Sequence, residues 1–249
     1  MKIDYNDRVA SSYDQRYVHN DTTDLDSFIA SFVNDRDVVA EIGCGTGHWL
    51  MHARSAGARH VIGVDSSAAM LAKARRAAPD AGLVRGTAER LPLGDASLDR
   101  VFCVNAHHHF LDLEGFIREV RRVLKPGGEF VTIALDPHTG ADQWWIYDYF
   151  VSTREADRRR YPSTARIRSL LEAAGFDHVA TSTGQHIPAA VSFSEAVERG
   201  LLDRTSTSQF LVISDLEFAH GVRTLHAERP VLRADLRLYA TSGRVPHVG

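Results

Sequence analysis

The chain has 249 residues, of which 44% are hydrophobic and 24% charged, which suits one globular domain with a full core. Its formal net charge of -3 excludes a global field that would recruit nucleic acid or an anionic membrane. The polar N-terminus has no apolar signal core, and no apolar run reaches the roughly 18 residues of a membrane span. Cys44 and Cys103 form no C-x-x-C pair, so we expect a cytoplasmic protein without a disulfide.

Apolar runs alternate with helical patterns along the first half of the chain. Two helices are expected before the first strand, over residues 9–17 and 25–33. Strands are expected over residues 38–42, 60–65, 82–87, 98–105 and 129–135, and the helices between them over residues 48–56, 67–78 (capped by Ser66) and 113–124. Strands that read as continuous apolar runs between helices indicate a parallel sheet covered on both faces.

The second half is less regular. Residues 137–161 are rich in aromatic side chains and are expected to form a helical insertion, followed by a helix over residues 164–174 that Gly175 closes. Two further strands, over 177–183 and 231–241, enclose two or three helices within residues 194–228, and one of these strands is expected to run antiparallel. We therefore expect a single α/β domain with helical cap insertions.

The most informative stretch is Glu41-Ile42-Gly43-Cys44-Gly45-Thr46-Gly47, which joins the first strand to a helix. A glycine-rich turn at that point lets backbone approach a nucleotide-like ligand closely, although it also suits a purely structural turn. The spacing G-x-G-x-G differs from the G-x-G-x-x-G of dinucleotide sites. Glu41 would repel a pyrophosphate and suits a ligand that carries a positive charge.

Polar residues at the ends of the next strands complete a nucleoside site. Asp65 follows the second strand, about 20 residues beyond the turn, where an acid accepts hydrogen bonds from two ribose hydroxyls unless it merely flanks a helix. Thr87 and the backbone of Ala88 are placed to read an adenine edge, and Met70 either covers the ring or packs in the core. His107, His108 and His109 point in different directions, so no metal site is expected.

Five segments together resemble a class I S-adenosylmethionine-dependent methyltransferase, of the type 11 group that acts on small molecules and is similar to ubiquinone and menaquinone biosynthesis methyltransferases. The resemblance covers residues 9–136. Its segments are Glu41–Gly47, Gly63-Val64-Asp65, Thr87–Leu93, Ser97–Val101 and Arg122–Gly128. Each is unspecific alone, and their order and spacing are specific together.

The resemblance implies a Rossmann-like, mostly parallel sheet of seven strands with one antiparallel strand, and a bound S-adenosylmethionine whose product is S-adenosylhomocysteine. Glu41 and the glycines would serve the methionine part, and Asn105 would lie near the methyl end. Thr87 stands where the family often has Asp, which weakens the contact with the adenine amino group. The expected cofactor-binding residues are Tyr13, Arg16, Glu41, Gly43, Gly45, Gly47, Asp65, Ser66, Met70, Thr87, Ala88, Glu89 and Asn105.

The N-terminal segment also fits this family, because its members often close the site with a helix that bears a tyrosine and an arginine. Arg16 would pair with the methionine carboxylate, and Tyr13 would favour the sulfonium by a cation–π contact. Residues 1–34 are therefore expected to be a helical lid, although a surface helix with aromatic packing is the plainer interpretation.

Methyl transfer needs a base only where the acceptor carries a proton. His108 is the first candidate, followed by His107 and His109, unless a histidine merely fills this turn. The acceptor pocket is expected to lie between the insertions at 137–161 and 190–229, the second of which would form a pocket wall or the interface of a homodimer. Its expected substrate residues are Tyr17, Trp144, Trp145, Tyr147 and Tyr149, whose rings would alternatively pack into the domain core.

The leading functional hypothesis is a methyltransferase for a small metabolite, with no nucleic acid or membrane partner and no metal. One alternative is an RNA methyltransferase, for which the sequence has no broad basic surface. Another is a protein that binds S-adenosylmethionine without transferring its methyl group. A nicotinamide oxidoreductase fits least, because of the turn spacing and Glu41.

Overall fold

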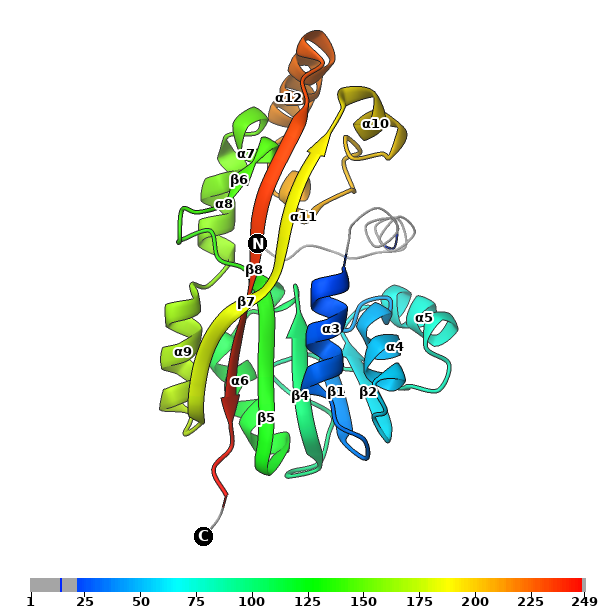
Figure 1. Ribbon diagram of the computed structural model, residues 1–249, viewed down its shortest axis with the longest axis vertical. Coiled ribbons are helices and arrows are strands. Elements are labelled where there is room, and N and C mark those ends of the chain that lie inside the picture. Colours follow the sequence, from blue (N-terminus) through cyan, green and yellow to red (C-terminus); the bar gives the residue numbers. More distant parts are fainter. Residues whose placement is uncertain (1–13, 15–21, 248–249) are drawn as a thin grey trace.

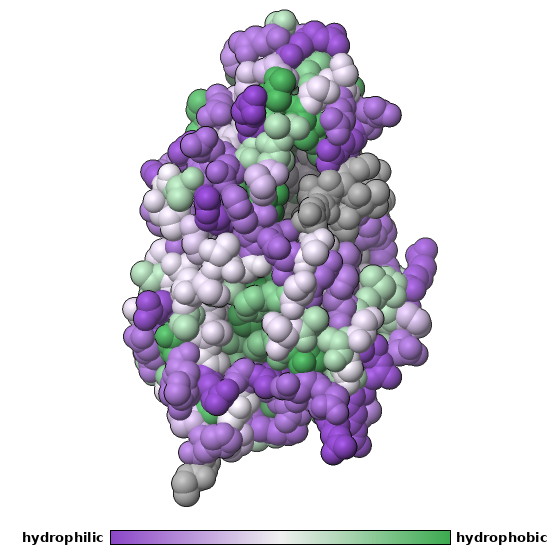
Figure 2. Space-filling model, in the orientation of Figure 1, coloured by the Kyte–Doolittle hydropathy of each residue, from purple (hydrophilic) through white to green (hydrophobic). Residues whose placement is uncertain are grey.

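The computed structural model, which describes Asp14 and residues 22–247, is elongated and has two lobes (Figure 1). The lower lobe is a twisted sheet with helices on both faces, and the upper lobe is built from helices around the far ends of two long strands. The face shown in Figure 2 is largely hydrophilic, with apolar residues in the middle of the lower lobe, between β7 and α3, and others on the upper lobe.

Within the described residues the sheet has eight strands, in the order β3-β2-β1-β4-β5-β8-β6, with β7 also paired to β8. Strands β1 to β5 are parallel, whereas β8 runs antiparallel to β5, β6 and β7. The strands are β1 (Val38–Ile42), β2 (His60–Asp65), β3 (Gly82–Arg85), β4 (Leu98–Val104), β5 (Leu124–Leu135), β6 (Gln143–Trp144), β7 (Asp177–Val191) and β8 (Leu232–Arg244). The mostly parallel α/β sheet with one reversed strand is confirmed.

Two details of the sheet differ from expectation. The strand count is eight instead of seven, because the two-residue β6 pairs with β8 and is too short to leave a periodic pattern. The seventh strand, β7, continues to Val191 instead of ending at residue 183. Beyond that point it pairs with β8 as far as Val191 opposite Leu232, so that the pair carries the sheet into the upper lobe.

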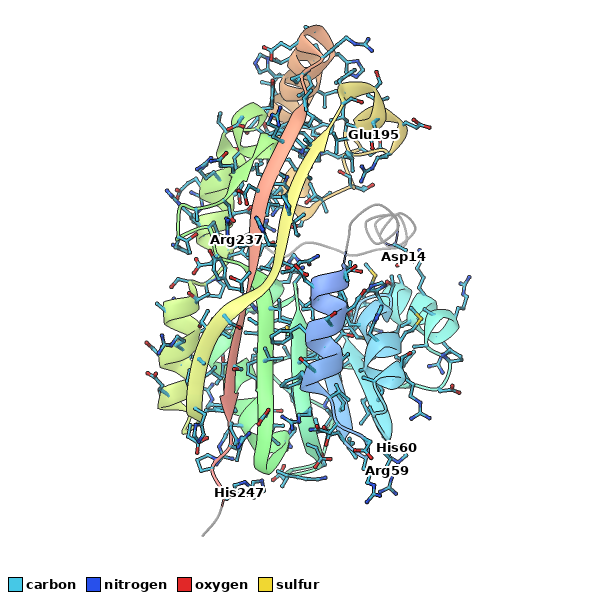
Figure 3. The ribbon with its side chains drawn as sticks, viewed as in Figure 1. Asp14, Arg59, His60, Glu195, Arg237 and His247 are labelled. Carbon is cyan, nitrogen blue, oxygen red and sulfur yellow. The ribbon has the colours of Figure 1, made fainter. Side chains whose placement is uncertain are left out.

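The upper lobe joins two segments that lie far apart in the sequence. Its helices pack around one apolar cluster that includes Trp145, Phe150, Phe193, Phe210 and Leu225. At the junction of the lobes, the backbone N–H of Arg237 on β8 donates to Asp142 Oδ1 at 3.0 Å (Figure 3). The helices are α7 (Trp145–Tyr149), α8 (Ser152–Arg160), α10 (Phe193–Glu198), α11 (Ser208–Leu211) and α12 (Asp215–Glu228).

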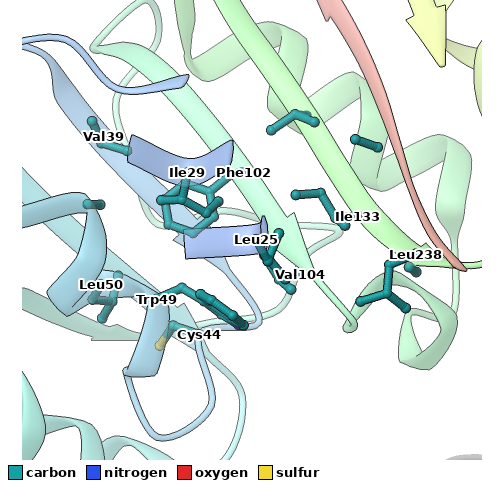
Figure 4. Packing of buried hydrophobic residues seen from close by; sticks show 14 of the residues in the cluster. Leu25, Ile29, Val39, Cys44, Trp49, Leu50, Phe102, Val104, Ile133 and Leu238 are labelled. Atoms are coloured by element: carbon teal, nitrogen blue, oxygen red, sulfur yellow. The ribbon is translucent and has the colours of Figure 1, made fainter. Parts of the chain in front are cut away.

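The helices of the lower lobe cover the two faces of the sheet with two separate apolar clusters. Val39 of β1 packs on one face with Leu25 and Trp49 (Figure 4), and its neighbour Ala40 packs on the other face with Phe116. This alternation follows from the two-residue period of a strand. The helices are α3 (Thr23–Phe32), α4 (His48–Ser55), α5 (Ala68–Ala77), α6 (Leu113–Val123) and α9 (Thr164–Ala173), with the short 3-10 helix η1 (His107–His109).

The N-cap of α5 is Ser67 and not Ser66. The backbone of Ser67 is extended (φ -88°, ψ 117°), and its hydroxyl accepts the N–H of Met70 at 3.2 Å. Ser66 and Ser67 carry the same hydroxyl group, so the backbone conformation after β2 decides which of them is the N-cap. None of the helices within residues 22–247 combines the length and the apolar character that crossing a membrane requires.

Candidate functional site

The turn between β1 and α4 is a tight backbone loop at the carboxyl ends of the parallel strands. Gly43, Gly45 and Gly47 all have positive φ, of 75°, 52° and 85°. A Cβ on Gly43 would lie 2.4 Å from the Cβ of Ala106, so a larger residue would displace the chain there. The predicted glycine turn therefore lies at the edge of the sheet where ligands of open α/β folds bind.

Asp65, at the end of β2, holds its carboxylate against this turn. Its Oδ2 accepts the backbone N–H of Gly45 at 2.9 Å, and its Oδ1 accepts that of Ser67 at 2.8 Å. Burial raises the pKa of the Asp65 carboxyl, against the lowering effect of these backbone bonds. A carboxylate has about four acceptor positions, and a bond from the backbone of Ser66 is the third that Asp65 accepts, so acceptor capacity remains for a hydroxyl donor of a ligand.

Glu41 is a buried acid beside the same turn. Its side chain is 1% exposed, and its Oε2 receives no hydrogen bond from the described part of the chain. Burial, and then the negative charge of Asp65, raise the pKa of the Glu41 carboxyl well above its ordinary value. A buried acceptor without a donor next to a second carboxyl favours a cationic hydrogen-bond donor such as an ammonium group.

The loop after β3 completes the edge where an adenine is expected. Ala88 and Met70 are buried, and Thr87 pairs with Arg90 in a one-bridge turn. Glu89 accepts the backbone N–H of Leu111 at 2.8 Å, so its carboxylate also anchors the loop that follows η1. The cofactor contacts of these residues stay predictions.

The three histidines lie in η1, directly after β4, and face different partners. Asn105 has a positive φ of 49° and ends the strand, and its N–H donates to Ile133 O at 2.8 Å. The Nδ1 of His107 lies 2.6 Å from Thr132 Oγ1, and burial lowers the pKa of His107 to about 4. His107 is thereby held against β5 as a weak base.

His108 instead stacks on an aromatic ring from the junction between α8 and α9. The ring of Tyr161 lies 3.9 Å from the ring of His108 at an interplanar angle of 16°, and His109 also lies 3.9 Å from His108. No local sequence pattern indicates this contact, because the two residues are 53 positions apart. Tyr161 joins the predicted base to the upper lobe.

Tyr161 belongs to a buried polar cluster that sequence analysis missed. Asp157 is fully buried and accepts hydrogen bonds from Tyr147 Oη and Gln209 Nε2, both at 2.9 Å, and from Arg160 at 2.6 Å. The Gln209 amide also donates to Tyr161 Oη at 3.5 Å. This cluster ties α7, α8 and α11 together close to His108.

The predicted substrate residues of the upper lobe take up varied positions. Trp145 packs against Phe150 and Phe210 in the apolar cluster, and Tyr149 Oη donates to Glu228 at 2.8 Å. Trp144 lies in β6 instead of on a helix, and its ring meets that of Tyr147 edge to face at 5.4 Å. Their role toward an acceptor stays a prediction, and Tyr13, Arg16 and Tyr17 lie outside the described residues.

Comparison with known proteins agrees with this geometry. A methyltransferase domain family model matches residues 40–132. YcgJ, an uncharacterised methyltransferase of Bacillus subtilis (strain 168), is 38% identical over 139 residues, which are 54% of this chain and 52% of that protein. A phthiotriol/phenolphthiotriol dimycocerosates methyltransferase of Mycobacterium tuberculosis (strain H37Rv) is 37% identical over 109 residues, 43% and 40% of the two chains.

The likeness to solved structures extends over more of the chain and concerns the fold. A putative methyltransferase from an antibiotic biosynthesis pathway of Anabaena variabilis superimposes with a TM-score of 0.68 at 22% identity, over 88% of this chain and 95% of that one. In sequence, the chain spans about half the length of the curated relatives named above.

Proposed function

We propose that the protein is a class I S-adenosylmethionine-dependent methyltransferase that methylates a small apolar or aromatic metabolite, which the methyltransferase domain match over residues 40–132 supports. The observation that carries the proposal is the juxtaposition of Glu41, Asp65 and the glycine turn. An unsatisfied buried carboxylate beside a second carboxylate suits a ligand with a positive charge and a sugar diol.

The residues of the chain would divide the binding of S-adenosylmethionine among them. Asp65 would accept the ribose hydroxyls, Glu41 would face the methionine part, and Thr87 and Ala88 would meet the adenine. Met70 and Asn105 would lie along the nucleoside and near its methyl end. When bound, the cofactor supplies an activated methyl group on a sulfonium, which is already a good leaving group.

The chain's own contribution would then be positioning, with a base where the acceptor carries a proton. Holding an acceptor in line is worth about 7–11 kcal/mol in the best cases. His108 is the preferred base, since His107 is engaged with Thr132 and its pKa is lowered to about 4 by burial. The stack of His108 on Tyr161 would fix the plane of the imidazole.

The acceptor class is inferred from the upper lobe. Its aromatic residues and its connection to His108 through Tyr161 favour an apolar or aromatic acceptor bound between the lobes. The relative named for phthiotriol and phenolphthiotriol dimycocerosates is in keeping with such an acceptor, and a role in secondary metabolism is part of the proposal.

Calorimetry with S-adenosylmethionine tests the cofactor site. We expect Asp65→Ala to weaken binding by about 0.5–1.5 kcal/mol for each ribose hydrogen bond lost. Asp80→Ala is the matched control, because Asp80 is an exposed acid beyond the end of α5. Equal affinity of both variants, or tight binding of NADH by the wild type, would contradict the cofactor assignment.

Turnover separates the remaining alternatives. Incubation with methyl-labelled S-adenosylmethionine and a metabolite extract should label a small molecule. Label in added RNA instead would favour the RNA methyltransferase. Cofactor binding without any labelled product or S-adenosylhomocysteine would favour a protein that uses the cofactor structurally.

A further inference from the structure

Three metal-ligating side chains converge between α3 and α4, outside the cofactor site described above. They are Asp26 on α3 and His48 and His52 on α4, and one ligand atom from each lies within 4.8 Å of the others. His48 and His52 are four positions apart, so they project from the same face of the helix. We propose that this Asp26–His48–His52 cluster binds a divalent cation of the zinc class.

The carboxylate of Asp26 is held ready for such a cation. Its Oδ1 lies 3.4 Å from Nδ1 of His52, is buried, and accepts no hydrogen bond from the described part of the chain. Its Oδ2 accepts the hydroxyl of Thr22 at 3.0 Å. Outer hydrogen bonds of this kind orient carboxylate ligands and leave the second oxygen for the metal.

The separation of the ligand atoms fits a site that closes when a cation binds. Bonds of about 2.0–2.1 Å in a tetrahedron place neighbouring ligand atoms roughly 3.3 Å apart. The distance from Asp26 Oδ1 to His52 Nδ1, 3.4 Å, is already close to this spacing. The ring centroids of His48 and His52 lie 4.9 Å apart. We therefore expect rotation of the side chains to close the site around a cation.

The donor set selects the class of metal. Two imidazole nitrogens and one carboxylate oxygen suit Zn²⁺ and similar transition metals, with a fourth position left for water. Mg²⁺ and Ca²⁺ prefer sites made wholly of oxygen ligands, so they should compete poorly.

A bound cation would tie α3 to the first two turns of α4. These helices already pack through Leu25 and Ile29 of α3 and Trp49 and Leu50 of α4 (Figure 4). Because α4 begins directly after Gly47, the cation would also steady the end of the glycine turn. The site is nevertheless separate from Asp65 and Glu41, and it stands whether or not the protein transfers methyl groups.

Titration of the whole chain, after chelator treatment, with Co²⁺ tests the proposal. The wild type should bind one equivalent with visible d–d bands of a low-coordinate site, and Zn²⁺ but not Mg²⁺ should displace it. His52→Ala and Asp26→Asn should each weaken Co²⁺ binding by at least the roughly 10–100-fold that loss of an outer-shell partner costs. Added Zn²⁺ should raise the melting temperature of the wild type.

His60→Ala is the matched control, because His60 is an exposed histidine at the other end of the lower lobe (Figure 3). It should bind Co²⁺ as the wild type does. Circular dichroism of each variant should match that of the wild type, and Asp26→Asn preserves the shape of the side chain. Wild-type affinity in folded His52→Ala or Asp26→Asn, or loss of binding in His60→Ala, would overturn the site.

Discussion

His107 is a buried imidazole that makes folding sensitive to acid. Burial lowers its pKa from 6.5 to about 4, an effect that the charge of Asp136 only partly opposes. The unfolded chain therefore binds a proton between pH 6.5 and pH 4 that the folded chain refuses. The contribution of neutral His107 to the free energy of unfolding is present in full above pH 6.5. This contribution is lost as the pH falls through this window, by roughly 3 kcal/mol at pH 4.

Replacement of His107 should flatten this dependence. In urea unfolding between pH 6.5 and pH 4.5, the slope of free energy against pH should fall in His107→Asn by up to about 1.4 kcal/mol per pH unit. His48, whose pKa burial also lowers to about 4, keeps its own contribution in both proteins. His60→Asn, at an exposed site, should keep the wild-type slope, and a similar slope in all three proteins would argue against the assignment.

His108 is the residue on which the proposed chemistry is tested. His108→Phe retains an aromatic ring to stack on Tyr161 and removes both nitrogens. If His108 is a general base, turnover should fall by about 10²–10⁴ while the affinity for S-adenosylmethionine is unchanged. An unchanged rate and pH profile would leave His108 as a packing residue, whereas a loss of cofactor affinity would point to a structural effect on η1.

The juxtaposition of Glu41 and Asp65 could be predicted from the sequence, and the contact of His108 with Tyr161 could not. Glu41 and Asp65 lie near the carboxyl ends of the neighbouring parallel strands β1 and β2, which meet at one edge of the sheet, so sequence position alone brings them together. The contact of His108 with Tyr161 depends on how the segment after α8 returns over the sheet. No local sequence pattern predicts such a contact.

Among the elements, the helices of the upper lobe depend on the buried Asp157. Asp157→Ala would leave the guanidinium of Arg160 buried without its carboxylate, and would remove acceptors from Tyr147 and Gln209. Breaking a buried ion pair of this kind costs about 3–5 kcal/mol. We expect a destabilisation of that size in chemical unfolding.

Glu155→Ala on the same helix provides the comparison. Glu155 pairs with Arg159 at 3.3 Å, but both side chains are more than half exposed, so the change should cost less than about 1 kcal/mol. Equal costs for the two substitutions would mean that the buried cluster does not hold α7, α8 and α11 together.

The length of β7 could not be predicted from the sequence pattern. Residues 177–183 have the character expected of a strand, but Gly184 and Pro188 interrupt the pattern beyond them, and a proline normally argues against a strand. The proline is tolerated because β7, among the strands of the described residues, pairs only with β8, so one side of β7 needs no donor. The position of β7 at the edge of the sheet depends on the tertiary fold and cannot be predicted from the sequence of this segment alone.

At the scale of the whole molecule, the long β7–β8 pair runs through both lobes and joins them. The parallel strands and their glycine turn build the lower lobe, and the same sheet carries the helices of the upper lobe. The cofactor contacts proposed for the described residues come from the lower lobe, and the proposed acceptor contacts come mainly from the upper one. Ligands of the two kinds should therefore act on different parts of the chain.

Hydrogen exchange can test this division. S-adenosylhomocysteine at 100 times its Kd should stabilise the protein by about 2.7 kcal/mol and slow amide exchange most over residues 41–47 and 63–70. Amides of α10 and α12, which contribute no cofactor contact, should change least. Asp65→Ala should lose this protection at the same ligand concentration. Protection centred on the upper lobe would instead place the nucleoside there, and the division of roles between the lobes would be wrong.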